Sequence, residues 1–134
     1  MKSKTFLLGI MICFLAGCSG GGSTPGDDLF IPDISNQWVS SRTSIFFFNA
    51  DKTNVNESTF TGEEEGTRTV DGQEISYNDD FNGHFKNYDI SFTFTEGPDS
   101  LVTYSGKFVK GSNPLKMQLK GTNGKTLTIT RQPN

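Results

Sequence analysis

Residues 81–95 read FNGHFKNYDISFTFT, and this stretch decides the fold of the chain. In its second half, Ile90, Phe92 and Phe94 alternate with serine and threonine, and the phenylalanines of its first half also share one face. A period of two residues predicts β-strands that bury one face and expose the other to water. Asn87 lies between the two halves and is a residue type that favours turns. The stretch therefore predicts two antiparallel strands joined by a short turn.

The same alternation continues through the chain, and no segment after residue 30 shows a convincing 3.6-residue apolar period. Further strands are predicted at residues 37–41, 44–49, 58–61, 67–70, 73–77, 101–110, 115–120 and 126–130. Asp71-Gly72 suits the two-residue turn of a β-hairpin. Short antiparallel strands without a crossover helix predict an all-β fold, a single small up-and-down barrel of about eight strands, with a two-layer sandwich as the alternative.

Two parts of the first half are less regular. Residues 44–49 are apolar on both faces, so we expect this strand to be covered on both sides. The run Glu63-Glu64-Glu65 breaks the pattern, and we interpret it as a loop.

The first 18 residues carry a separate signal. Lys2 and Lys4 precede an apolar run at residues 6–16, which as a helix is about 16 Å long at 1.5 Å per residue. A membrane-spanning helix needs about 20 apolar residues, so the run suits a cleaved signal and not a stable span. With Leu15-Ala16-Gly17-Cys18 at its end, the segment resembles a bacterial lipoprotein signal peptide with its lipobox.

That resemblance implies a cellular location and a lipid anchor. Residues 1–17 would be removed, and Cys18 would carry diacylglycerol and a further acyl chain such as palmitate, which binds it stably to a lipid bilayer. Ser19 in place of aspartate indicates the outer membrane, with the protein facing the periplasm or the exterior. Residues 18–32 form a flexible Gly/Ser tether, and residues 33–134 form the barrel domain. The alternative is an ordinary secretory signal with an accidental cysteine.

Composition bounds the mature chain further. The 117 residues from Cys18 onward hold ten basic and fifteen acidic residues, a charge of −5 that argues against nucleic-acid binding. With Cys18 bound to lipid, no cysteine is left for a disulfide, so the domain depends on its core. Ten phenylalanines follow Cys18 and supply the bulk for that core.

The body also resembles small bacterial lipocalin-like lipoproteins, which are anchored and predicted to form up-and-down barrels. The resemblance covers residues 36–132 and rests on NQW (36–38), FNGHF (81–85), ISFTFT (90–95), TYSGKF (103–108) and LTITRQ (127–132). Lipocalins usually have glycine two residues before the tryptophan, where this chain has Asn36. The resemblance implies that Arg131 packs over Trp38. It implies little about activity, because most members of the group have none known.

No residue pattern points to catalysis, to a cofactor or to a metal. His84 is the single histidine, and its strand position places it on the wet face. The acidic runs at residues 63–65 and 79–80 fit neither an EF-hand nor another calcium motif, and we interpret them as solvated loop charge. Lys107, Lys110, Lys116 and Lys120 are interpreted as a soluble strand face. We therefore expect that the protein is not an enzyme.

The barrel interior is the remaining candidate for binding. The residues expected to line it are Trp38, Phe46, Phe48, Phe92, Phe94 and Tyr104. An eight-stranded barrel has room for side chains alone or for one small ligand, and the many phenylalanines favour a filled interior. We expect a non-enzymatic binding module that can hold a small apolar ligand. The alternatives are an envelope structural or interaction protein with a filled core, or an inhibitor of an envelope-degrading enzyme.

Overall fold

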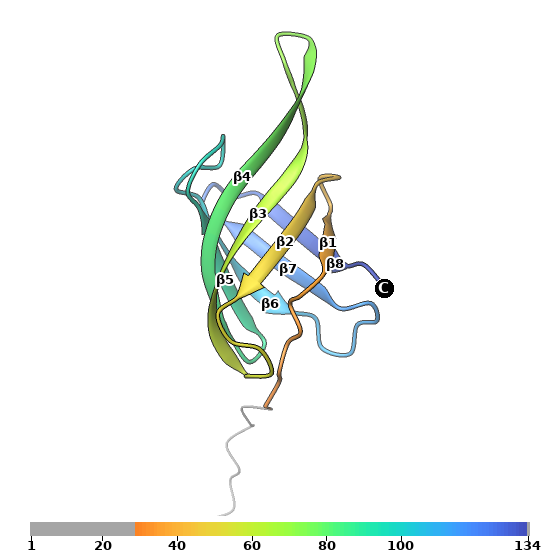
Figure 1. Ribbon diagram of the computed structural model, residues 1–134, viewed down its shortest axis with the longest axis vertical. Coiled ribbons are helices and arrows are strands. Elements are labelled where there is room, and N and C mark those ends of the chain that lie inside the picture. The colour runs from red at the N-terminus through yellow and green to blue at the C-terminus, as the bar shows by residue number, and fades with distance from the viewer. Residues whose placement is uncertain (1–28, 134) are drawn as a thin grey trace, which may run out of the picture.

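The computed structural model describes residues 29–133, so the predicted signal peptide, Cys18 and most of the predicted tether lie outside the described residues. Eight strands follow one another in the closed barrel of Figure 1, each antiparallel to its neighbours, and the last pairs with the first. Their bounds are β1 (Gln37–Ser40), β2 (Ile45–Ala50), β3 (Glu57–Val70), β4 (Gln73–Lys86), β5 (Asp89–Phe94), β6 (Thr103–Phe108), β7 (Lys116–Gly121) and β8 (Thr126–Arg131). The predicted all-β, up-and-down barrel of eight strands is confirmed.

The two-residue period of the sequence is the burial pattern of the strands. On β5, Ile90, Phe92 and Phe94 are buried, while the residues between them reach the surface. The remaining strands of the barrel wall alternate in the same way, and their buried side chains form one core that is mostly aromatic. No helix among residues 29–133 meets the length and hydropathy that a membrane crossing requires.

The turns follow from residues that accept a positive φ. Asp71 and Gly72 have φ of 51° and 80°, which is the pattern of the two-residue hairpin turn predicted at this place. Asn36 has φ of 74°. The left-handed region favours glycine but accepts asparagine. The structure thus explains how asparagine can stand where lipocalins usually have glycine.

The segment before β1 closes one end of the barrel. The indole N–H of Trp38 donates to the carbonyl oxygen of Ile34 at 2.9 Å. Phe30 stacks on Tyr88 with ring centroids 4.3 Å apart, so packing against the barrel begins at least as early as Phe30. Arg131 is the Cα partner of Trp38, and its guanidinium pairs with Asp33 at 2.6 Å. Arg131 is therefore a neighbour of Trp38 in the sheet, and the packing of its side chain over the Trp38 ring stays a prediction.

The predicted loop at residues 63–65 is wrong. β3 runs without interruption from Glu57 to Val70, and all fourteen of its residues pair with β4. The three glutamates break the apolar pattern because the side chain that faces inward, Glu64, has a cation, Arg42, as its partner. The expectation that residues 44–49 are covered on both sides is also wrong, because Ile45 and Phe47 lie half-exposed on the outer face of β2.

One hairpin is longer than the barrel wall. β2 pairs with β3 only from Phe60 to Glu65, and β5 pairs with β4 only from Phe81 to Lys86. Residues 66–79 therefore form a two-stranded ribbon whose strands pair only with each other. In Figure 1 this ribbon projects from the end of the barrel opposite the N-terminal segment.

Candidate functional site

The six aromatic residues predicted to line the interior lie together there. Trp38, Phe46, Phe92, Phe94 and Tyr104 are at most 1% exposed, and Phe48 is 8% exposed. Their neighbouring ring centroids are 5.8 to 6.3 Å apart, within the range of direct aromatic contact. A small apolar ligand would have to separate these rings, so ligand binding here stays a prediction.

Six residues cover this aromatic core at the end from which the ribbon projects. We call this group the polar lid, and its members are Arg42, Ser44, Glu64, Tyr77, Asp99 and Tyr104. Arg42 lies in the β1–β2 turn, and its guanidinium carbon is 5.6 to 6.0 Å from the ring centroids of Phe46, Phe94 and Tyr104. This distance suits an attraction between a cation and an aromatic ring. The guanidinium also binds Glu64 through two nitrogens, at 2.7 and 2.6 Å, and it binds Asp99 at 2.8 Å.

The rest of the lid holds the two carboxylates in place. The hydroxyl of Ser44 donates to Glu64, and the hydroxyl of Tyr77 donates to it from 3.3 Å. Tyr104 donates to Asp99 at 2.8 Å. These hydrogen bonds connect the β1–β2 turn with β3, β4, the β5–β6 loop and β6.

The interpretation of the acidic runs as solvated loop charge is wrong, because both runs lie on strands and one member of each is buried. Glu64 is 2% exposed and Asp79 is 7% exposed. The strand alternation places one carboxylate of each run on the inner face, where Arg42 neutralises Glu64 and Arg68 neutralises Asp79 at 3.2 Å. Nothing in the sequence marks Arg42 or Asp99 as members of this cluster, because their partners lie 22 and 57 residues away.

The pKa values of three groups in the polar lid differ from their ordinary values. Burial alone would raise the pKa of Asp99, but hydrogen bonds from Arg42 and Tyr104 outweigh it and hold that pKa below its ordinary 3.8. Burial likewise opposes the charge on Arg42, yet the hydrogen bonds to Glu64 and Asp99 raise the pKa of Arg42. Burial and the neighbouring Asp99 raise the pKa of Tyr104. At neutral pH these shifts favour the charged forms of Arg42 and Asp99 and the protonated hydroxyl of Tyr104.

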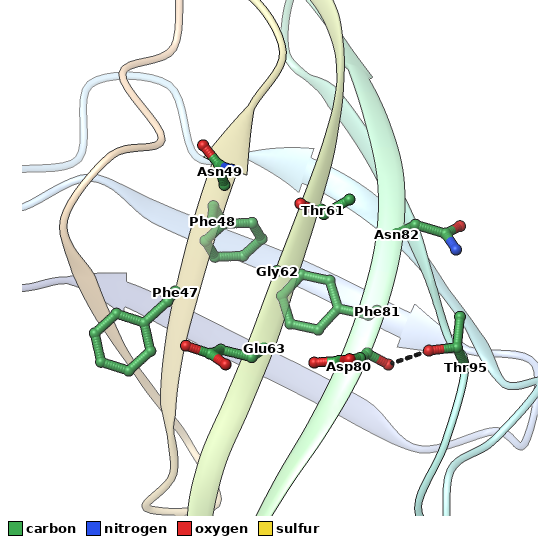
Figure 2. Close-up of a pocket in the computed structure, with 10 residues that line it drawn as sticks. All are labelled: Phe47, Phe48, Asn49, Thr61, Gly62, Glu63, Asp80, Phe81, Asn82 and Thr95. Atoms are coloured by element: carbon green, nitrogen blue, oxygen red, sulfur yellow. Dashed lines mark hydrogen bonds between the residues drawn. The ribbon is translucent and has the colours of Figure 1, made fainter.

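The outer face of β2, β3 and β4 forms a surface groove of about 400 Å³. Figure 2 shows the rings of Phe48 and Phe81 on either side of Gly62, where β3 has no side chain to separate them. Glu63 and Asp80 are Cα partners on β3 and β4. The other residues of the outer rim are Phe47, Asn49, Thr61, Asn82 and Thr95. The groove thus presents carboxylates and amides beside phenylalanine rings, a set that suits a polar or cationic partner.

Contacts between side chains support the ribbon. Arg68 pairs with Asp79, and its guanidinium carbon lies 4.7 Å from the ring centroid of Tyr77. At the base of the ribbon, Asn78 donates to Glu63 at 2.9 Å. At the tip, Val70 and Ile75 are 45% and 41% exposed. Every residue from 69 to 76 is exposed.

The other predicted residues lie where their strand positions indicated. His84 is exposed on the outer face of β4, and Lys107, Lys116 and Lys120 are exposed on β6 and β7. Lys110 is exposed after β6 and lies 5.7 Å from the ring centroid of Tyr88. Among residues 29–133 no three histidine, cysteine, aspartate or glutamate side chains are grouped to hold a metal ion.

Comparison with protein-family models, with curated proteins and with solved structures finds no match to this chain. The closed eight-stranded antiparallel barrel stands on the structure alone. The lipoprotein interpretation concerns residues outside the described range, so it is taken up below as a proposal.

Replacing Arg42 tests the polar lid. Arg42→Ala leaves Glu64 buried without its cation, and breaking a buried pair in this way costs about 3–5 kcal/mol of unfolding free energy. Adding Glu64→Gln removes the stranded charge, so the double variant is expected to be more stable than Arg42→Ala alone. Urea unfolding measures both. Lys125→Ala is the control, because this exposed partner of Asp99 contributes at most about 1 kcal/mol. A double variant no more stable than the single one would contradict the account.

Asp99 makes stability depend on pH. Its pKa is lower in the folded protein than its ordinary 3.8, so its contribution is full above about pH 5 and is lost as pH falls through the folded pKa. The variant Asp99→Asn is expected to be less stable than the wild type at neutral pH. That difference should shrink as the pH is lowered from about 5 toward 2. Urea unfolding over this pH range measures it, and a constant difference would contradict the prediction.

Proposed function

We propose that the protein is a non-enzymatic protein-binding module of the bacterial envelope, anchored by lipid at Cys18, and that the ribbon is its binding element. The observation that carries the proposal is the projection of residues 66–79 beyond the barrel wall on strands that pair only with each other. A filled aromatic interior favours a partner outside the barrel over a small ligand within it.

The ribbon is built to keep its shape in water. An isolated two-stranded hairpin is marginally stable, so it needs support from side chains. Here the Arg68–Asp79 pair, the Arg68–Tyr77 contact and the bond from Tyr77 to Glu64 connect the ribbon to the polar lid. A barrel that served only to enclose a core would not need these contacts, because a short β3–β4 turn would close it equally well.

The orientation of the domain supports the same proposal. The N-terminal segment and the tip of the ribbon lie at opposite ends of the molecule in Figure 1. Phe30 and Ile34 contact the barrel, and only residues 19–28 separate the described segment from Cys18. If Cys18 is lipidated, the end of the barrel that the N-terminal segment closes faces the bilayer. The ribbon then points away from the bilayer, toward partners.

The lipid anchor predicts specific labelling. We expect the full-length protein to incorporate radioactive palmitate in growing cells and to fractionate with membranes, because two or more acyl chains bind a protein stably to a bilayer. The Cys18→Ala variant should incorporate no label. Cys13→Ala is the control, because Cys13 lies within the predicted signal peptide. An unlabelled wild-type protein would end the proposal of an anchor.

The ribbon predicts where partners are contacted. A photo-crosslinking amino acid is placed at Thr69 on the ribbon, and the matched control places it at Gln118, which is exposed on β7 of the barrel wall. After irradiation of intact cells, we expect a protein adduct of defined mass from position 69 and none from position 118. Adducts from neither position, or the same adducts from both, would contradict the ribbon as the binding element.

A further inference from the structure

We infer that the β3 edge of the ribbon binds a basic, extended polypeptide segment, which adds to it as a further antiparallel strand. This inference rests on the proposed function and names the class of partner and the mode of binding. In strand addition, backbone hydrogen bonds supply affinity and alternate side chains supply specificity.

The β3 edge becomes free where β2 begins. Ile45, the first residue of β2, pairs with Glu65, and from Gly66 to Val70 the only strand beside β3 is β4. Residues 41–44 do not continue β2 along this edge, because the chain turns there toward β1. Five residues of β3 thus offer one open side.

The hydrogen bonds show which backbone groups face that side. The carbonyl oxygen of Asp80 accepts from the N–H of Thr95, so the backbone of Asp80 faces β5 and not β3. Its Cα partner Glu63 must then face β2, and the same holds for every second residue of β3. Thr59 obeys this rule, because its carbonyl accepts from Asp51 beyond the end of β2. Thr67 and Thr69 therefore point their N–H and C=O groups to the open edge.

This edge lacks the lysines, prolines and bulges that commonly protect a free strand from pairing. Proteins block free strand edges with lysine, proline, bulges or covering segments. Residues 63–80 contain no lysine and no proline. The β3–β4 register runs through fourteen consecutive pairs without a bulge. Beside the edge lies an open groove of about 670 Å³, and the residues that line it include Thr43, Ile45, Glu65 and Thr67. An added strand would lie along this groove in line with β2.

The negative charge of residues 63–80 favours a basic partner. Residues 63–80 hold seven acidic residues and one basic residue, Arg68. The inward carboxylates of Glu64 and Asp79 are neutralised by arginine. The acidic residues that face outward or lie at the turn have no ion-pair partner among residues 29–133, and they are Glu63, Glu65, Asp71, Glu74 and Asp80. A strand with lysine or arginine at alternate positions would place cations beside them.

A second copy of this chain fits the edge poorly. Two ribbons side by side would bring their outward carboxylates together, and like charges opposed across a strand pair are destabilising. The same repulsion keeps the free edges from self-association. The geometry and the charge therefore select a different, basic polypeptide.

The test uses the full chain and a defined probe. A fluorescein-labelled octapeptide in which valine and lysine alternate is titrated with wild-type protein, Thr67→Pro and Ser76→Pro. Thr67 and Ser76 are Cα partners, but the backbone of Thr67 faces the β3 edge and that of Ser76 faces the β4 edge. We expect Thr67→Pro to bind the peptide about tenfold more weakly than the wild type, and Ser76→Pro to bind it unchanged. Thr69→Pro, on the same edge, replaces Thr67→Pro if that variant fails to fold.

Peptide controls separate strand addition from plain charge attraction. An octapeptide of alternating proline and lysine has the same charge but lacks half of the backbone donors, and we expect it to bind as weakly as Thr67→Pro binds the original peptide. Equal binding of both basic peptides, equal binding by Thr67→Pro and wild type, or loss of binding in Ser76→Pro alone would overturn the inference. A dimer of the protein that Thr67→Pro abolishes would overturn the choice of a basic partner. Adducts at Thr69 that persist despite such results would leave the proposed function standing.

Discussion

The pairing of β1 with β8 is the constraint on which the rest of the structure depends. It is short, with Trp38, Val39 and Ser40 opposite Arg131, Thr130 and Ile129, yet it closes the barrel. Closure removes free edges from the barrel wall, which matters for a domain that has no disulfide to stabilise it. Among the described residues, open edges then remain chiefly where β3 and β4 outgrow their neighbours. The ribbon is therefore the exception in a fold that otherwise leaves few places for another strand.

The polar lid supports the ribbon. The ribbon begins where the aromatic core ends, so the residues at that boundary must satisfy charges on one side and contact rings on the other. Arg42 does both, because a guanidinium can lie over aromatic faces while its nitrogens bind carboxylates in the plane. Through Tyr77 and Glu64 the lid extends into the ribbon. The support of the ribbon and the cover of the core are thus one hydrogen-bonded cluster.

The sequence predicted what depends on local periodicity and missed what depends on distant pairing. Ile90, Phe92 and Phe94, the Asp71-Gly72 turn and the six interior aromatics could be predicted because alternation and turn chemistry are local signals. The continuity of β3 could not be predicted, because a buried Glu64 makes sense only beside Arg42, which comes from another turn. The ribbon was missed for a related reason. Its two strands were predicted, but their excess length depends on where β2 and β5 end.

The placement of charge gives the last step of the argument. The inner face of the long hairpin carries Glu64 and Asp79, each neutralised by an arginine of this chain. The outer face carries carboxylates at Glu63, Glu65, Glu74 and Asp80, and the chain supplies them no cation among the described residues. Lysines spread over the same face would protect the free edge from pairing. A face that keeps its carboxylates and omits such lysines is suited to a partner that brings the cations with it.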